Sequence, residues 1–158
     1  MLPKSHIVFG LIFSLTLLLI FPEIGFVGFF IIWASSVLID VDHYLFYVWL
    51  KKDWSLKNSY RWFVIKYRKH RKLTRRQRIE RVKHHGPIPC IFHGIETAII
   101  LIILSFFHQI FLFILIGILF HQFLDLIYSI SFSSNFSHFG SQIYNYFKFK
   151  KKLAKTKH

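Results

Sequence analysis

Four long apolar runs dominate this sequence and restrict how it can fold. They extend over about residues 5–21, 24–50, 90–107 and 110–130. Each approaches the roughly 20 apolar residues that a helix needs to cross the hydrocarbon core of a bilayer. With 54% hydrophobic residues and a mean hydropathy of +0.43, the chain is too apolar for an ordinary soluble domain or a disordered segment. The sequence therefore predicts an all-α fold, a four-helix transmembrane bundle.

The positive charges lie outside these runs. Of the 21 Lys and Arg residues, fourteen lie in a basic loop at residues 51–87, six in a tail at residues 148–158, and one is Lys4. The short connections at Pro22-Glu23 and His108-Gln109 carry none. Because Lys and Arg collect in cytoplasmic loops, we expect a multi-pass protein of the cell (inner) membrane with both termini and the basic loop in the cytoplasm. Residues 1–147 would form a single membrane domain.

The basic loop has two interpretations. Its aromatic residues Tyr60, Trp62 and Tyr67 alternate with cations, as they do in some nucleic-acid-binding segments. Anionic lipid headgroups explain the same charges, since each cation near the membrane surface contributes about 1 kcal/mol. We favour membrane lipids as the partner over nucleic acid, and we expect the stretch 75–83 to suit a surface helix. The loop would also attract an acidic or phosphorylated substrate.

Eight ionisable side chains lie within the apolar runs, and every run contributes at least one. They are His6, Asp40, Asp42, His43, His93, Glu96, His121 and Asp125. An Asp at the centre of a membrane helix costs about 2.5–3.5 kcal/mol on insertion scales. No Lys or Arg lies between residues 5 and 50 or between residues 88 and 147 to neutralise these acids. These carboxylates can still be neutralised by protonation, by a charged histidine or by a metal ion. The mixture of imidazole and carboxylate groups favours the metal ion.

The spacing of these residues supports a shared site. The pairs on one helix face are Asp40 with His43, His93 with Glu96, and His121 with Asp125, three or four residues apart. Asp42 does not share a face with Asp40 in a regular helix, so either the helix ends near Asp40 or Asp42 binds a second ion or supports a ligand. In the predicted topology all eight converge on the inner half of the bilayer. We interpret Cys90 as an apolar packing residue.

The order of these motifs along the chain is also informative. Ser5-His6 and Gly10 open the first run, Asp40-x-Asp42-His43 closes the second, His93 follows, and Gly117-x3-His121-x3-Asp125 lies in the last. Over about residues 3–130 this set resembles the membrane-bound metal-dependent hydrolase family (YbcI/YdjM type), which is grouped with zinc-dependent phospholipase C and P1 nuclease. The resemblance implies that His6, Asp40, Asp42, His43, His93, His121 and Asp125 bind metal or support its ligands. The chain departs from the family pattern before the third helix, and that pattern does not account for Glu96.

Together these features predict an integral-membrane metal-dependent hydrolase that acts on an ester or phosphoester at the cytoplasmic membrane face. Zn²⁺ is the first candidate metal, with Mn²⁺ and Fe²⁺ as alternatives, and it would lower the pKa of a bound water towards about 7. Asp42 or Glu96 would serve as general base. The alternatives are a di-metal membrane oxidoreductase, a metal or proton transporter and a non-enzymatic membrane anchor.

Overall fold

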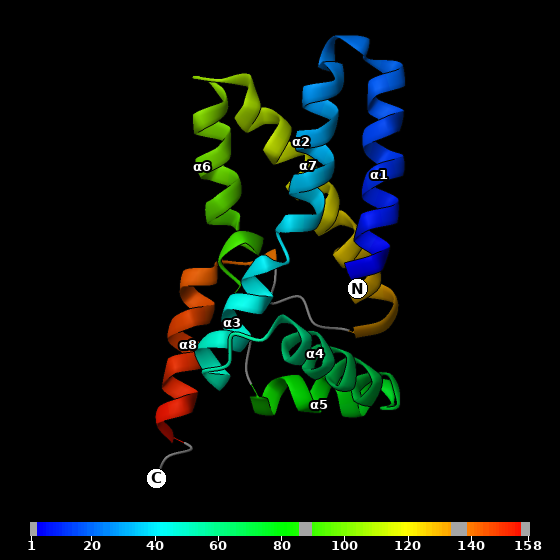
Figure 1. The fold of residues 1–158 in the computed structure, drawn as a ribbon. Coiled ribbons are helices and arrows are strands. Elements are labelled where there is room, and N and C mark those ends of the chain that lie inside the picture. Colours follow the sequence, from blue (N-terminus) through cyan, green and yellow to red (C-terminus); the bar gives the residue numbers. More distant parts are fainter. Residues whose placement is uncertain (1–2, 86–89, 134–138, 156–158) are drawn as a thin grey trace. The chain divides into compact units, whose positions relative to one another are not determined.

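The computed structural model describes residues 3–85, 90–133 and 139–155, and all regular structure in these ranges is helical (Figure 1). The predicted all-α fold is therefore confirmed for the described part of the chain. The glycine and prolines at residues 86–89 predict a break in the chain, and this stretch lies outside the described residues. The chain divides into two compact units, the first formed by residues 1–40 and 95–127 and the second by residues 41–94 and 128–158. The single membrane domain over residues 1–147 stays a prediction.

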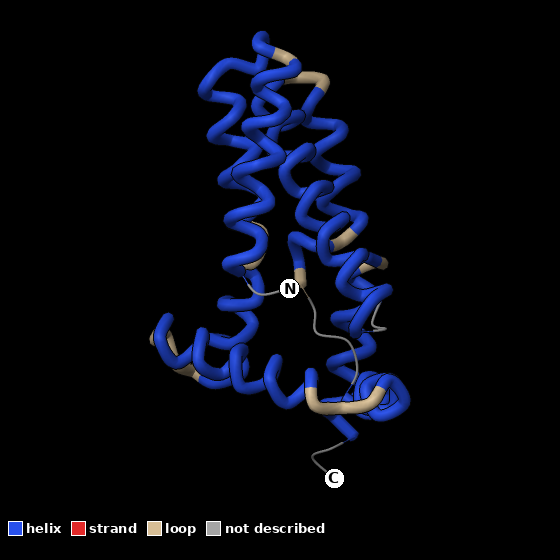
Figure 2. The backbone as a smooth tube through the Cα atoms, turned by 90° about the vertical axis from the view of Figure 1, so that its right-hand side faces the viewer, coloured by secondary structure: helices blue, strands red, loops and turns tan. Residues whose placement is uncertain are grey.

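The first unit contains four apolar helices. They are α1 (Pro3–Ile20), α2 (Gly25–Leu38), α6 (Ile95–Ser105) and α7 (Gln109–Tyr128). α1 and α2 lie side by side as an antiparallel hairpin, which Figures 1 and 2 both show. Their connection is the short 3-10 turn η1 (Pro22–Ile24), and Gly25 follows it with a φ of 64° that favours glycine.

Small residues bring the helices of the first unit into close contact. A side chain at Gly10 of α1 would collide with the Ser36 hydroxyl of α2, and one at Gly117 of α7 would collide with the Ser35 hydroxyl and the Ile32 carbonyl. Such small-residue contacts let helix backbones approach closely, as in membrane helix bundles. The close approach at Gly117 places the next turn of α7, which carries His121, beside the backbone of α2.

The second unit holds the basic loop and the C-terminal segment. Its elements are α3 (Val41–Lys51), α4 (Leu56–Arg71), α5 (Arg75–His85), η2 (Ile91–His93), the π-helical turn η3 (Ser129–Ser133) and α8 (Gln142–Lys155). The Ser55 hydroxyl accepts from the Asn58 N–H at the start of α4. Thr74 and Gln77 form a reciprocal capping box at the start of α5, with hydrogen bonds of 2.9 and 3.3 Å. The stretch 75–83 is thus helical, as the sequence predicted.

The aromatic residues of the basic loop take part in packing within the second unit. The Trp62 ring meets the Tyr47 ring edge-on, with 5.6 Å between their centroids. The Lys66 ammonium lies 3.7 Å from the centroid of the Trp62 ring, a cation–π contact. Trp62 is therefore engaged by neighbouring side chains of the second unit, and lipid as the partner of the loop stays a prediction.

The second apolar run is not one uninterrupted helix. α2 ends at Leu38, Ile39 and Asp40 form a turn, and α3 begins at Val41. The alternative in which the helix ends near Asp40 is confirmed. It agrees with the preference of Asp for helix ends, where its short polar side chain competes for backbone hydrogen bonds.

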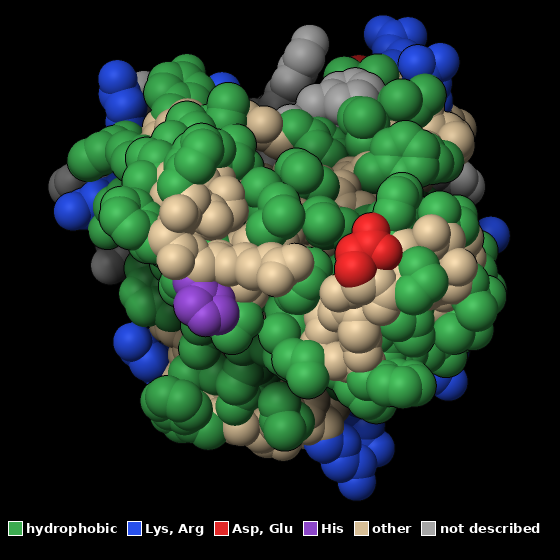
Figure 3. All heavy atoms as spheres, turned by 90° about the horizontal axis from the view of Figure 1, so that it is seen from above, with side chains coloured by type: hydrophobic (Ala, Val, Ile, Leu, Met, Phe, Trp, Pro, Cys, Tyr) green, Lys and Arg blue, Asp and Glu red, His purple; other side chains and the backbone are tan. Residues whose placement is uncertain are grey.

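The lengths of the helices support only part of the predicted membrane bundle. Among the described residues, two stretches are long and apolar enough to cross a membrane, Pro22–Lys51 and Gln109–Ser131. The described part of α1 and α6 are shorter apolar helices. Many large hydrophobic side chains are nevertheless exposed on all four helices, including Leu19, Phe26, Ile103 and Phe123. Figure 3 shows that hydrophobic side chains make up most of the surface on the side that it views.

Candidate metal centres

The first unit gathers four of the predicted residues, which we call site 1: His6, Asp40, His121 and Asp125. His6 comes from α1, Asp40 from the turn after α2, and His121 and Asp125 from successive turns of α7. The two imidazoles are buried, with 1% and 0% of their surface exposed, and the side chains of Asp40 and Asp125 are 18% and 13% exposed. The donor atoms of His6, Asp40 and His121 all lie within 4.8 Å of one another.

The distances in site 1 are close enough for its side chains to hold one ion. His121 Nε2 lies 3.4 Å from Asp125 Oδ2 and 3.6 Å from Asp40 Oδ1, and His6 Nε2 lies 3.4 Å from Asp125 Oδ1. These separations exceed the usual hydrogen-bond range of about 2.7–3.2 Å. Nitrogen and oxygen ligands about 2.0–2.2 Å from a tetrahedral zinc are about 3.4 Å apart. The spacing is therefore compatible with a divalent ion as well as with ion pairs between the imidazoles and the carboxylates.

The tautomer of His121 supports the same interpretation. Its Nδ1 lies 2.7 Å from the carbonyl oxygen of Ser36, which can only accept, so Nδ1 carries the proton and donates. In the neutral ring, Nε2 then directs a lone pair towards the carboxylates of Asp40 and Asp125. A lone pair opposite two carboxylates is repulsive unless a proton or a metal cation lies between them. A backbone carbonyl that fixes the outer nitrogen of a ligand histidine is also common in metal sites.

The imidazole of His6 stacks on the imidazole of His121 in site 1. Its ring lies parallel to that of His121, with 3.9 Å between centroids and 17° between planes. Neither ring nitrogen of His6 makes a hydrogen bond with any residue that the structure describes. A buried polar atom without a hydrogen bond costs about 1–3 kcal/mol. A cation beside Nε2, opposite Asp125, would supply the missing interaction.

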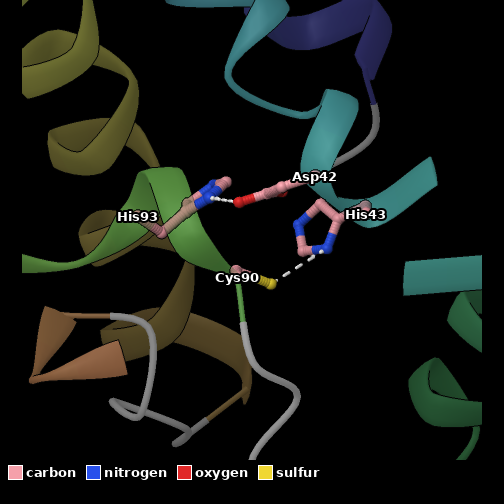
Figure 4. Close-up of side chains that lie close together, drawn as sticks. All are labelled: Asp42, His43, Cys90 and His93. Carbon is pink, nitrogen blue, oxygen red and sulfur yellow. Dashed lines mark hydrogen bonds and ion pairs between the residues drawn. The ribbon is translucent and has the colours of Figure 1, made fainter. Parts of the chain in front are cut away.

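The second unit gathers three further predicted residues and one that was not predicted. Asp42 and His43 lie in the first turn of α3, Cys90 directly precedes η2, and His93 ends it (Figure 4). We call this group site 2. A 3-10 helix has three residues per turn, so Cys90 and His93 fall on the same side of it. The four donor atoms lie within 4.8 Å of one another.

Hydrogen bonds orient the side chains of site 2. His93 Nδ1 donates to Asp42 Oδ2 at 2.9 Å, and the backbone N–H of Phe92 donates to the same oxygen at 3.2 Å. Cys90 Sγ lies 3.3 Å from His43 Nδ1, and the two face each other in Figure 4. Asp42 is 3% exposed, and its Oδ1 has no hydrogen-bond partner in the described part of the chain.

Seven of the eight predicted residues thus lie in these two groups. Glu96, in the first turn of α6 and half-buried, belongs to neither group among the described residues. Sequence reasoning missed two residues. Cys90 is fully buried, as a packing residue would be, but it also lies among the donors, and its position three residues before His93 was the available signal. Gln142, whose Oε1 accepts from the Cys90 N–H at 3.0 Å, left no signal in the sequence.

Comparisons with known proteins do not identify a function for this chain. No family model matches the chain, and neither does any curated protein or solved structure. The resemblance to membrane-bound metal-dependent hydrolases therefore rests on the sequence motifs alone and stays a hypothesis.

Proposed function

We propose that this chain is an integral-membrane metal-dependent hydrolase whose divalent ion is bound at site 1. The observation that carries the proposal is the orientation of His121: Ser36 holds its Nδ1, and its Nε2 faces Asp40 and Asp125 at ligand-like separations. Zinc bound there would lower the pKa of a water molecule to about 7 and provide hydroxide for attack on an ester or phosphoester.

The donor set favours hydrolytic over oxidative chemistry. Site 1 offers two imidazoles and two aspartates, a nitrogen and oxygen set that suits zinc. Di-iron bundles instead take glutamates from each helix, with paired Glu-x-x-His motifs. Asp42 is hydrogen-bonded to His93 and Phe92 in the second unit. Glu96 of α6 lies outside both donor groups of the described residues, so its assignment as general base rests on the sequence alone.

The exposed apolar surface supports a membrane location for the proposed enzyme. Phe26, Phe106 and Phe107 are 75%, 84% and 80% exposed, which is unfavourable in water and natural in lipid. We propose four spans with both termini and the basic loop in the cytoplasm. α1, with 18 residues, is about 27 Å long and close to the thickness of the hydrocarbon core. α6 has 11 residues and is about 17 Å long, shorter than the hydrocarbon core, and the residues that flank it at 91–92 and 106–107 are apolar.

The substrate follows from charge and location. The cations of α4 and α5 would attract anionic headgroups or phosphorylated groups to the membrane face. A phosphoester at the boundary of lipid and water is therefore the substrate class that we propose.

Metal analysis combined with an activity assay tests the proposal. The full chain, purified in detergent, should contain stoichiometric zinc and hydrolyse p-nitrophenyl phosphate, bis(p-nitrophenyl) phosphate or phospholipid vesicles. Site 1 contains His121 and Asp125 as direct donors, so His121→Ala and Asp125→Ala should each lower metal affinity and turnover by about 100-fold or more. The matched control is His108→Ala, because His108 is an exposed histidine in the turn before α7.

Other outcomes would contradict the proposal. Wild-type protein without stoichiometric metal would contradict metal binding at site 1. The same holds if His121→Ala has the same metal content as the wild type. Iron with a visible absorption band would indicate an oxidoreductase instead, and metal uptake into proteoliposomes would indicate a transporter.

A further inference from the structure

Site 2 contains a thiol that the proposed hydrolysis at site 1 does not use. We propose that Asp42, His43, Cys90 and His93 bind a zinc ion of their own through a Cys90 thiolate, and that this ion stabilises the second unit. The inference goes beyond the proposed function, since it concerns different residues and requires no catalysis.

The number and type of donors match a structural zinc site. Four side chains supply one sulfur, two imidazoles and one carboxylate, the full complement of a tetrahedral ion. Catalytic zinc sites keep one position for water or substrate, whereas structural sites are closed. Cys90, His93 and Asp42 are 0%, 1% and 3% exposed, so the site has little access for a substrate.

The position of Cys90 favours a ligand over a nucleophile. Reactive cysteines occupy partially exposed positions, whereas Cys90 is fully buried. Its Sγ lies 3.3 Å from His43 Nδ1. A sulfur about 2.3 Å and a nitrogen about 2.0 Å from a tetrahedral zinc would be about 3.5 Å apart. The sulfur–nitrogen distance is therefore close to that of two ligands on one ion.

Asp42 supplies the observation that points to a cation. Its Oδ2 accepts a hydrogen bond from the Phe92 N–H at 3.2 Å and lies 2.9 Å from His93 Nδ1. Without an ion, this nitrogen carries a proton and donates to Oδ2; with zinc bound, it would lose that proton and direct its lone pair to the ion. Its Oδ1 is buried and makes no hydrogen bond with the described residues. A buried carboxylate oxygen is costly without a hydrogen bond or a positive charge, and zinc beside the sulfur and imidazoles would satisfy it.

The ion would join segments that are far apart in sequence. Asp42 and His93 are 51 residues apart, and Gln142 reaches Cys90 across 52 residues. Gln142 begins α8 and is 5% exposed, so its hydrogen bond positions the backbone of Cys90 from a third segment. Zinc at site 2 would offset part of the entropy lost when these long loops close.

Cobalt substitution tests the thiolate directly. Cys90 is the one cysteine of the chain, so any thiolate-to-cobalt charge-transfer band must come from it. The metal-free full chain in detergent, titrated with Co²⁺ alone, should develop this near-ultraviolet band at one equivalent, and Zn²⁺ should remove it. Cys90→Ser should lack the band. His121→Ala should keep it, which separates a failure of site 2 from a failure of site 1.

A second measurement covers a Cys90→Ser variant that fails to fold. In wild-type protein under mild denaturant, Zn²⁺ should slow maleimide labelling of Cys90 by about 10-fold or more, because a metal-bound thiolate is protected. Gln142→Ala should weaken cobalt binding by about 10–100-fold and retain the band, while Tyr144→Ala on the exposed side of α8 should not change it. Cobalt bound without the charge-transfer band, or a labelling rate unaffected by Zn²⁺, would overturn the proposal.

Discussion

Asp53 connects the end of α3 to the start of α4. Its carboxylate accepts from the Tyr47 hydroxyl at 2.6 Å, the Ser55 N–H at 2.9 Å and the Asn58 side-chain amide at 3.0 Å. These donors, the Tyr47 hydroxyl first, hold the pKa of the Asp53 carboxyl below its ordinary value. The ionised form is thus the one that stabilises this corner of the second unit.

The lowered pKa of Asp53 predicts a pH-dependent contribution to stability. Because the folded pKa lies below the unfolded one, the contribution is present above about pH 4 and is lost as the pH falls through the folded value. Asp53→Asn should therefore lower the Tm at pH 7 and approach the wild-type Tm near pH 3. Thermal unfolding in detergent at several pH values measures this. Glu80→Gln, on an exposed helix face, is the control and should change the Tm less. Equal pH dependence in wild type and Asp53→Asn would contradict the prediction.

The sequence was sufficient to identify most of the polar residues in the two sites. It was not sufficient to show which of them lie together. His121 and Asp125 could be found because acids inside apolar runs without nearby Lys or Arg need another partner. Cys90 was harder to find, because a lone cysteine resembles any small apolar residue and its spacing from His93 was a weak signal. Gln142 left no signal, because a glutamine beside a basic tail resembles a solvated residue. Their roles arise from contacts across about 50 residues of chain, which only the fold determines.

At the level of helices, glycine controls the geometry of site 1. Gly117 lies one turn before His121, and its lack of a side chain lets α7 approach the Ile32 carbonyl of α2. That approach brings His121 Nδ1 within 2.7 Å of the Ser36 carbonyl. The Gly117-x3-His121 motif thus combines a helix packing contact with a candidate metal ligand one turn later.

Gly117→Ala should therefore damage both packing and metal binding. The new methyl group would collide with a backbone carbonyl, which cannot rotate away, and overpacking of this kind costs about 1–3 kcal/mol. We expect a lower Tm and a reduced zinc content in the purified protein. Gly140→Ala is the matched control, since a methyl group there meets no atom within 4 Å. Similar losses in both variants would show that Gly117 has no special role.

Helix boundaries were harder to predict than helix content, and the helix end near Asp40 was predicted only as one of two alternatives. The apolar run 24–50 contains no proline or charge before Asp40, yet α2 and α3 are separate helices. The run 90–107 begins with a 3-10 turn, so α6 starts only at Ile95. In both places the hydrophobic pattern continues through the break, because hydropathy reports the environment of a segment and not the local backbone geometry.

At the scale of the whole chain, charge separates by unit. Lys4 is the one Lys or Arg of the first unit, and the second unit contains the other 20. Each unit combines two stretches that are distant in sequence, so the association of His6 with α7, or of Cys90 with α3, depends on folding. The distribution of cations does not depend on these details, and it is the strongest support for the proposed topology.

The proposed topology predicts opposite accessibility for two exposed positions. Lys72 lies in the basic loop and His108 in the short connection before α7. If cations remain on the cytoplasmic side, a membrane-impermeant maleimide added to intact cells should label His108→Cys and not Lys72→Cys, and permeabilised cells should label both. The wild-type chain is the control, because fully buried Cys90 should stay unlabelled in folded protein. Labelling of Lys72→Cys alone in intact cells would show the opposite orientation. Labelling of both positions in intact cells would show that the basic loop and the connection before α7 do not lie on opposite sides of the membrane.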